Sequence, residues 1–314
     1  MYVVIGANGQ VGRKVVEQLS RRGAAVRAIV QRVEAGQALP HVEARVGDAT
    51  DVAFLREALS GADALFTLTP PSFNAPSHAR AVDRAAAAAS PARSTPSHAR
   101  AVDRFGSAVL AAIAASDVRK VVNLSSAGAT LPQGTGPIAG LYRNEQRLNS
   151  LATVDVLHLR AASFMENLLA KIGPMRQSGV LPDMADGDVP MPMVAAADLA
   201  QAAANALLAP TFTGKSAAAL LGDRDYTMRE AAAILGAAVG RPDIAYVRTA
   251  PADAKAALIA HGFSPDVADQ FEEMADALSQ RRIQDTVTRT AASTTATSLQ
   301  AWAREVFAPA FQSA

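Results

Sequence analysis

Three glycines close to the start of the chain are spaced so that they could hold a phosphate group. Gly6, Gly9 and Gly12 directly follow Tyr2–Ile5, an apolar, β-branched run that is typical of a buried parallel strand. In a turn between a strand and a helix, the first glycine permits a sharp bend, the second lets a pyrophosphate approach the backbone, and the third lets the helix pack against the strand. The spacing therefore predicts a dinucleotide site, and the alternative is an ordinary glycine-rich turn.

Helical periodicity begins directly after the turn and favours the dinucleotide interpretation. The residues from Gln10 onward repeat apolar side chains at helical spacing, and Val26–Val30 then forms a second apolar run. Strand, turn, helix and strand together fit the ~30 residues of a nucleotide-binding unit. The backbone amides of Asn8, Gln10 and Val11 would face the phosphates at the positive end of the helix.

The residues after the second predicted strand discriminate between two cofactors. A carboxylate at this place would accept hydrogen bonds from the 2′-hydroxyl of NAD, but the chain has Gln31 and Arg32. An arginine can instead pair with a 2′-phosphate. We therefore predict that NADP(H) is preferred over NAD(H). Two alternatives remain, because Arg32 could be a solvated loop charge and Glu34 could take the role of the carboxylate.

Further polar residues stand at the carboxyl ends of predicted strands, where open α/β sheets bind their ligands. Asp48 follows a strand at 42–46, and it could accept a hydrogen bond from an adenine amino group or, like Asp51, cap the next helix. Thr69 and Pro70 end a strand at 64–69, and Ser125 ends one at 120–125. We expect these side chains to line the cofactor crevice.

The elements that must position these residues alternate between strands and helices. This alternation predicts an α/β fold with a doubly wound parallel sheet, a Rossmann fold, over residues 1–160. Residues 161–314 are predicted to form a smaller, mainly helical C-terminal domain that binds substrate. Within it, residues 195–222 should return to the Rossmann sheet as a long helix, which begins near Met193 and ends at Leu208, and a last strand at 216–221.

Composition excludes several classes of protein. With 50% hydrophobic and 19% charged residues the chain should fold, and 30 basic against 29 acidic residues without a long basic cluster argue against nucleic-acid binding. The chain has no cysteine, which excludes disulfides, thiolate metal sites and a cysteine nucleophile. No charged leader and no apolar run of ~18 residues is present. We expect a cytoplasmic protein without a membrane segment, and a homodimer is compatible with the sequence.

A nonapeptide occurs twice between the fourth and fifth predicted strands. Residues 76–84 recur unchanged as residues 96–104, with a period of 20 residues. Two copies are too few for a solenoid, so we interpret the repeat as a tandem duplication that lengthens a connection. A lid over the crevice, or a metal site formed by His78 and His98, are the alternatives. No third ligand stands at metal-binding spacing, so we expect no metal.

Two later stretches bear on the substrate. Residues 127–140 are too rich in glycine and proline for regular structure and lie where substrate should enter. His158 lies in the middle of a predicted strand among apolar residues, so we interpret it as a core histidine rather than a catalytic one. The side chains of Phe164 and Met165 are predicted to line an apolar cleft, with Asn167 beside them.

The glycine motif, Gly47-Asp48, residues 123–128, residues 159–167 and residues 198–200 together resemble the NmrA-like branch of the atypical short-chain dehydrogenases/reductases. The resemblance covers nearly the whole chain apart from the duplication. It implies a Rossmann domain, a smaller C-terminal domain and a substrate cleft between them. The branch includes NAD(P)H-dependent quinone and azo-dye reductases and redox-sensing regulators.

The chain departs from the superfamily in one respect. Typical members use Tyr-x-x-x-Lys, whose tyrosine donates a proton to a carbonyl and whose lysine activates that tyrosine. Here Tyr142 is followed four residues later by Gln146, and no lysine stands between Lys120 and Lys171. Without such a cation Tyr142 would be a poor acid at neutral pH, so ordinary carbonyl reduction is in doubt. Gln146 is the candidate to hold the ribose, and Tyr142 remains a candidate catalytic and substrate-contacting residue.

Two hypotheses from different classes follow. The first is an NADPH-dependent reductase that passes a hydride to a quinone, an azo compound or a similar flat conjugated acceptor. Such an acceptor delocalises the charge that arrives, so the enzyme mainly has to position it over the nicotinamide. The second is a sensor that binds NADP(H) and acts on a protein partner without turnover. A fold alone does not separate the two.

Overall fold

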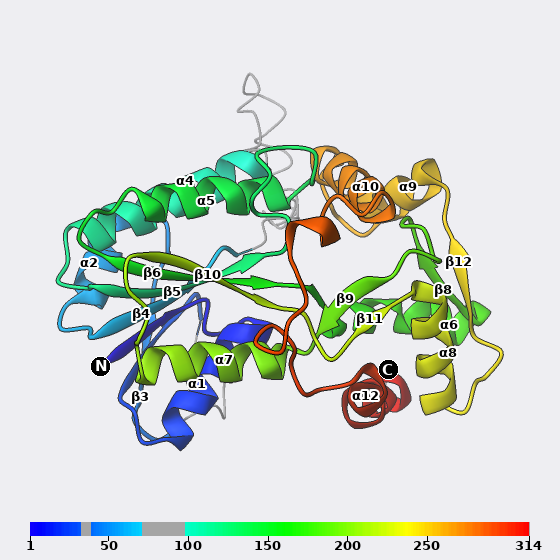
Figure 1. Cartoon of the computed structure of the whole chain (residues 1–314), viewed down its shortest axis with the longest axis horizontal. Helices are drawn as coiled ribbons and strands as arrows, with labels where there is room; N and C mark the ends of the chain where they lie inside the picture. Colours follow the sequence, from blue (N-terminus) through cyan, green and yellow to red (C-terminus); the bar gives the residue numbers. More distant parts are fainter. Residues whose placement is uncertain (33–38, 71–97, 314) are drawn as a thin grey trace, which may run out of the picture.

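A sheet of seven parallel strands forms the centre of the computed structural model, which describes residues 1–32, 39–70 and 98–313 (Figure 1). The strands are β1 (Tyr2–Ile5), β2 (Val26–Val30), β3 (Val42–Val46), β4 (Ala64–Leu68), β5 (Lys120–Ser126), β6 (Asp155–Ala161) and β10 (Lys215–Leu220). Their order is β10-β6-β5-β4-β1-β2-β3, and every neighbouring pair is parallel. The chain winds outward from β1 through β2 to β3 and then returns to β4 on the other side of β1. The predicted doubly wound parallel sheet is therefore confirmed, and its order reverses between β1 and β4.

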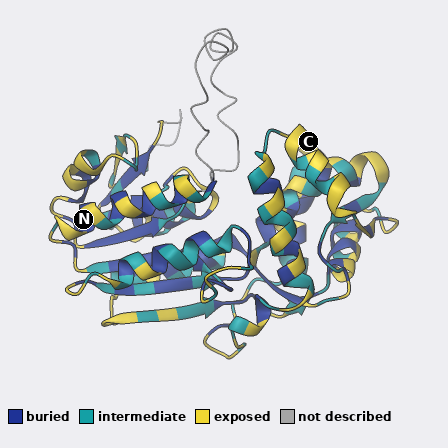
Figure 2. Ribbon diagram, turned by 90° about the horizontal axis from the view of Figure 1, so that it is seen from above, coloured by how far each residue is buried: buried dark blue, intermediate teal, exposed yellow. Residues whose placement is uncertain are grey.

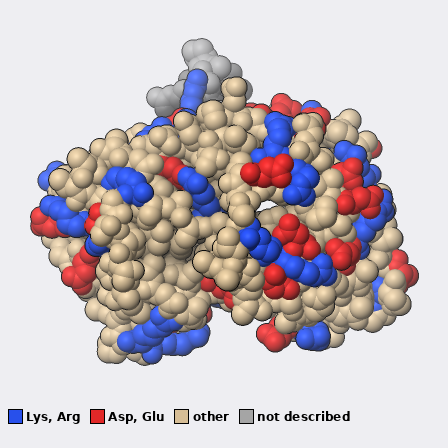
Figure 3. Space-filling view, viewed as in Figure 1, with Lys and Arg blue, Asp and Glu red and all other residues tan. Residues whose placement is uncertain are grey.

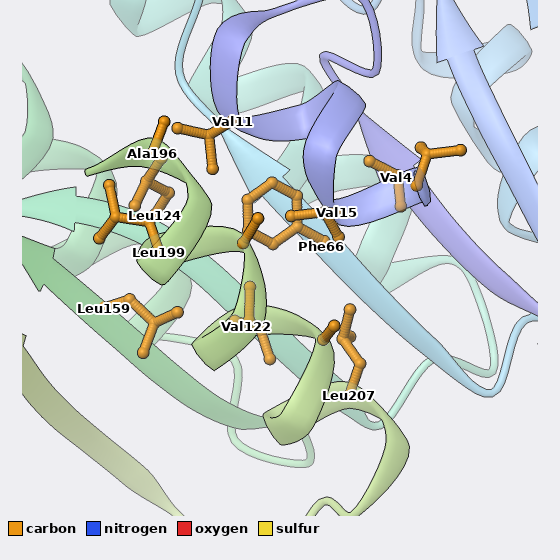
Figure 4. Packing of buried hydrophobic residues seen from close by; sticks show 14 of the residues in the cluster. Val4, Val11, Val15, Phe66, Val122, Leu124, Leu159, Ala196, Leu199 and Leu207 are labelled. Atoms are coloured by element: carbon orange, nitrogen blue, oxygen red, sulfur yellow. The ribbon is translucent and has the colours of Figure 1, made fainter. Parts of the chain in front are cut away.

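Helices cover both faces of the sheet. One face is packed by α1 (Gln10–Arg21) and α7 (Ala196–Leu208), and the other by α2 (Val52–Leu59), α4 (His98–Ala114) and α5 (Ile138–Asn149). Successive residues of a strand point to opposite faces, so Val4 packs beneath α1 and α7 whereas Val3 packs beneath α2 and α4. Figure 4 shows the hydrophobic core on the face that α1 and α7 cover, in which Phe66 of β4 lies between Val15 of α1 and the side chains of α7. In Figure 2 the inner strands of the sheet are largely buried, whereas the edge strands β3 and β10 are intermediate or exposed at most positions.

The remaining residues form a second unit with its own core. Its strands are β7 (Ser163–Phe164), β8 (Val180–Asp183), β9 (Met191–Val194), β11 (Asp225–Tyr226) and β12 (Ala245–Arg248). Its helices are η1 (Met165–Lys171), α6 (Ile172–Ser178), α8 (Met228–Ala238), α9 (Pro251–Ala260), α10 (Pro265–Ser279), η2 (Gln284–Thr286), α11 (Leu299–Trp302), the π-helical turn η3 (Ala303–Phe307) and α12 (Ala308–Ser313). Trp302, Tyr226 and Phe307 are its largest fully buried side chains. The predicted smaller, mainly helical C-terminal region is confirmed, and it also contains two small sheets.

The start of the long helix is the main correction to the predicted elements. We expected a helix from Met193, but Met191–Val194 is a strand and α7 begins at Ala196. All four residues of this strand are buried, and it pairs with both β7 and β11. Pairing with distant strands therefore decides the conformation here. The carboxylate of Glu166 accepts a hydrogen bond of 3.0 Å from the amide of Ala196, which satisfies one donor in the first turn of α7.

A connecting segment, residues 281–297, ties the second unit to the carboxyl edge of the sheet. The guanidinium of Arg289 donates to the carbonyl oxygens of Gly222 and Leu221, at 2.7 and 2.9 Å, just beyond β10. The hydroxyl of Thr297 donates to Asp198 in the first turn of α7 at 2.8 Å.

Charged side chains of both signs are distributed over the face of the molecule seen in Figure 3, including the region between the two units. None of the described helices is long and apolar enough to cross a membrane.

Candidate functional site

The glycine turn has the geometry that the sequence predicted. Gly6 adopts a positive φ of 80°, which bends the chain directly after β1, and the amide of Gly9 donates to the Gly6 carbonyl oxygen at 2.9 Å. A Cβ on Gly12 would stand 2.1 Å from that same oxygen. Only glycine therefore lets α1 start so close to β1, and the turn lies beside the point where the strand order reverses.

The first turn of α1 offers backbone donors at this edge. Its N-cap is Gly9, and no side chain of the described residues caps it, so the amides of Gln10 and Val11 keep no helical partner. The helix α2 starts at the same edge but is closed by Asp51, whose carboxylate accepts from the amides of Ala53 and Phe54 at 2.9 and 3.2 Å. An anion placed against α1 would meet free amides and the positive end of the helix dipole.

The end of β2 is held beside the glycine turn. The side-chain amide of Asn8 donates to the carbonyl oxygen of Arg32 at 2.9 Å, and the amide of Ala7 donates to that of Ile29 at 3.3 Å. Gln31 and Arg32 are both exposed. Asn8 thus connects the predicted phosphate turn to the residues predicted to distinguish NADP(H) from NAD(H).

Asp48 and Asp51 have different structural roles. Asp51 caps α2, whereas Asp48 is exposed and its carboxylate accepts from the amide of Thr50 at 2.8 Å in the turn before that helix. Asp51 is therefore the residue that caps α2, and the adenine contact predicted for Asp48 stays a prediction.

A buried ion pair occupies the interface between α5 and the ends of β5 and β6. Glu145 of α5 is 1% exposed, and its two carboxylate oxygens accept hydrogen bonds from the guanidinium of Arg160, from Nη2 at 2.6 Å and from Nε at 3.1 Å. The hydroxyl of Ser125 donates to the same carboxylate at 2.6 Å. Ser125 was predicted to line the cofactor crevice, but it is buried and its hydroxyl hydrogen is committed to Glu145. Residues 145 and 160 were not identified from the sequence.

The helix α5 directs Tyr142 and Gln146 away from its buried face. The residues that pack toward the sheet and α4 are Gly140, Asn144, Glu145 and Leu148. At 100° per residue, Gln146 lies almost opposite the centre of this face, and it is exposed. The ribose contact predicted for Gln146 stays a prediction. Tyr142 lies on the flank and is half-buried.

Two arginines of α5 are paired with an aspartate of α4. Arg143 and Arg147 donate to Asp103 at 2.9 and 2.8 Å. Burial raises the pKa of Asp103, but the hydrogen bonds from Arg143 and Arg147 outweigh this effect and hold the pKa below its usual value. Neither arginine is therefore an uncommitted cation that could replace the missing lysine beside Tyr142.

His158 is the core histidine that the sequence predicted. It is 2% exposed, and its two ring nitrogens lie 3.0 Å from the side-chain amides of Asn123 and Asn149. Burial lowers the pKa of His158 below its ordinary value; Glu145 raises it, while Arg160 and Lys215 lower it further. The imidazole of His158 is buried in the sheet and hydrogen-bonded at both ring nitrogens, so its role is structural.

The loop at residues 127–137 is held by the C-terminal unit, and the last three residues of the stretch predicted to lack regular structure, 138–140, instead begin α5. The amide of Gly128 donates to Thr286 at 2.8 Å, that of Gly136 to Glu273 of α10 at 3.2 Å, and Arg282 donates to the Gly134 carbonyl oxygen at 2.9 Å. These contacts place α10 and the connecting segment over the region where substrate was predicted to enter. The partners lie more than a hundred residues apart, so no local sequence signal identifies them.

The predicted substrate residues separate into different environments. Met165 is fully buried in the core of the second unit, which removes it from a substrate-facing position. Phe164 is half-buried, and Asn167 is exposed in η1.

Two predicted cofactor residues lie directly beyond β4. Thr69 is half-buried and accepts a hydrogen bond of 2.8 Å from Asn144, and Pro70 is exposed.

Within the second copy of the repeated nonapeptide, residues 98–104 form the beginning of α4. His98 is 5% exposed, and its amide donates to Asp266 of α10 at 3.1 Å. His78 and the rest of the first copy lie outside the described residues, so the lid and metal alternatives are not tested. Among the described residues no group of three or more metal-ligating side chains comes together.

These features define a Rossmann-type dinucleotide-binding protein. The family model for NAD(P)H-binding proteins matches residues 6–210, and the chain belongs to this family. The predicted resemblance to the NmrA-like branch is also confirmed. A comparison with curated protein sequences found no match.

Several solved structures share the fold. An NADPH-dependent quinone oxidoreductase, QOR2 from Escherichia coli in complex with NADPH, has a TM-score of 0.72 and 23% identity, over 98% of this chain and 100% of that one. The triphenylmethane reductase of Citrobacter sp. with NADP(H) has a TM-score of 0.68 and 22% identity, over 100% and 99%. NmrA, a negative transcriptional regulator in complex with NADP, has a TM-score of 0.67 and 15% identity, over 99% and 97%. Reductases and a regulator thus share this architecture.

Proposed function

We propose that the chain is an NADPH-dependent reductase that transfers a hydride to a quinone, an azo compound or another flat conjugated acceptor. The glycine turn at the reversal of the strand order would hold the pyrophosphate. Gln31 and Arg32, next to that turn, would receive the adenosine end with its 2′-phosphate. The bound cofactor supplies the hydride, and the described residues bind and orient the two reactants.

The observation that carries the choice of acceptor is the buried Ser125–Glu145–Arg160 cluster. In a typical carbonyl reductase of this superfamily, a tyrosine activated by a lysine would donate a proton to the carbonyl oxygen. Here the Ser125 hydroxyl donates to a carboxylate, and the guanidinium groups of Arg143, Arg147 and Arg160 all pair with carboxylates. An acceptor that spreads the incoming charge over a conjugated system needs no such acid.

The proposal is tested by mixing pure protein with NADPH and a panel of quinones, azo dyes and simple ketones, and following the absorbance of NADPH. We expect NADPH to be consumed with at least one quinone or azo dye and not with the ketones. Turnover of ketones alone would contradict the proposed acceptor class. Tight NADPH binding without oxidation by any acceptor would favour a redox sensor instead.

A matched pair of glycine variants separates cofactor binding from folding. A Cβ at Gly9 would lie 3.2 Å from the Gly6 carbonyl oxygen, a contact that requires a shift of a few tenths of an ångström, and it would project where the pyrophosphate should approach. A Cβ at Gly173 in α6 meets no atom within 4 Å. Gly9→Ala should therefore weaken NADPH binding at little cost in stability, and Gly173→Ala should bind as the wild type does. Equal affinities in the two variants would contradict the placement of the pyrophosphate.

A further inference from the structure

The side chain of Asn144 links α4, α5 and the end of β4. It is 5% exposed, and its amide nitrogen donates to the hydroxyl of Thr69 at 2.8 Å. Its amide oxygen accepts from Arg147 at 2.7 Å. The proposed chemistry has not used this residue, although it contacts a position predicted to line the cofactor crevice.

The partners of Asn144 fix which way its amide points. A guanidinium can only donate, so the atom of Asn144 that faces Arg147 must be the oxygen, and the NH₂ group must face Thr69. Arg147 is itself held by Asp103 at 2.8 Å. A chain of three hydrogen bonds therefore runs from Asp103 through Arg147 and Asn144 to Thr69.

The backbone of α4 leaves room for this arrangement. A Cβ on Gly106 would stand 2.0 Å from the amide oxygen of Asn144. Any other residue at position 106 would therefore displace the amide or push the two helices apart. Asp103 lies one helical turn before Gly106, so α4 supplies both the anchor of the chain and the space for it.

Thr69 lies next to the glycine turn. It follows Leu68, the last residue of β4, and a Cβ on Gly6 would be 3.0 Å from the Leu68 side chain. Because the Thr69 oxygen accepts from Asn144, its own hydrogen is not needed for that bond. The hydroxyl can then act as a donor at the carboxyl edge of the sheet, where the dinucleotide is expected.

We propose that Asn144 is a positioning residue that holds Thr69 as a hydrogen-bond donor to bound NADP(H). The inference rests on the proposed cofactor site. Asn144 does not touch the cofactor in this account, and it acts only through the direction of the Thr69 hydroxyl.

The test uses Asn144→Asp, which keeps the size of the side chain and its contact with Arg147 but removes the donor. The Thr69 hydroxyl should then donate to the new carboxylate and turn its hydrogen away from the cofactor. Fluorescence titration should show the Kd for NADPH raised on the order of tenfold, because a hydrogen bond to the bound cofactor is lost. In steady state the loss should appear in the KM for NADPH with kcat nearly unchanged. Asn205→Asp, the same charge change on the exposed face of α7, is the control and should leave the Kd unaltered.

Variants of Thr69 decide whether Asn144 acts through it. Thr69→Val should raise the Kd about as much as Asn144→Asp, Thr69→Ser should recover most of that loss, and the double variant should be no weaker than Thr69→Val alone. Losses that multiply in the double variant, or a Thr69→Val protein that binds NADPH as the wild type does, would overturn the inference. The Thr69 variants decide it even if Asn144→Asp fails to fold. Failure of the wild type to bind NADPH would instead remove the proposed function itself.

Discussion

Replacement of Tyr142 by phenylalanine tests whether a protein side chain supplies a proton. Tyr142 is half-buried on the flank of α5, and within the described part of the chain its hydroxyl makes no hydrogen bond. The neighbouring guanidinium groups of Arg143 and Arg147 are neutralised by Asp103, and that of Arg160 by Glu145. None of these three guanidinium groups is therefore an uncommitted cation that could activate the phenol as an acid.

We expect Tyr142→Phe to lower kcat with a quinone or azo acceptor by less than about tenfold, which is under ~1.4 kcal/mol of transition-state stabilisation. Any loss should appear mostly as weaker binding of the acceptor. Loss of a true general acid would cost ~10²–10⁴ and would remove the high-pH limb of the rate profile. Steady-state kinetics of wild type and variant from pH 6 to 10 separate these cases. A hundredfold fall in kcat with acceptor binding intact would refute the reasoning.

Three further predictions follow. Arg32→Ala should weaken NADPH binding by roughly ten- to a hundredfold, since charge-assisted bonds to the 2′-phosphate contribute ~1.5–3 kcal/mol, and should leave NADH almost unchanged in fluorescence titrations; equal losses would exclude the assignment. Deletion of residues 76–95 leaves one copy of the nonapeptide, of which residues 98–104 begin α4, so the shortened protein should fold and bind NADPH in calorimetry and titration. Precipitation, or lost activity in a folded protein, would mean that the deleted segment is part of the structure or a lid. Burial lowers the pKa of His158, so the unfolded chain binds the extra proton and the free energy of unfolding should fall as the pH drops below about 6.5; denaturant melts should show a shallower fall in His158→Gln, and an unchanged slope would contradict this account.

The elements that could be predicted from the sequence are those with a local signal. The apolar runs of β1 and β2 and the amphipathic residues 52–59 matched the structure to the residue, because burial on two faces or on one stripe leaves a pattern in the chain itself. The strand β8 was missed because its stability comes from pairing with β12, some sixty residues later. The same reason explains Met193 and Val194, which are held in a strand by partners on both sides.

Within the candidate site, too, the features that could be predicted are those with a local signal in the sequence. The glycine turn was predictable because strand, turn and helix are consecutive in the chain. Glu145 was not, because its role depends on Ser125 and Arg160, which meet it only when α5 packs on the sheet. Gln146 was named by its distance from Tyr142 along the chain, and only the packing of α5 shows that its neighbour Glu145 faces the sheet. The contacts that α10 and the connecting segment make with the loop at residues 127–137 likewise join distant parts of the chain.

The central claim is that this chain passes a hydride from bound NADPH to a conjugated acceptor without an acid from the protein. The most direct measurement is single-turnover oxidation of NADPH carrying deuterium at the transferred position of the nicotinamide, with the best quinone or azo acceptor from the panel. We expect a primary isotope effect on the oxidation, of the same size in wild type and in Tyr142→Phe. No oxidation of bound NADPH, or an isotope effect in wild type that accompanies a hundredfold slower step in Tyr142→Phe, would contradict it.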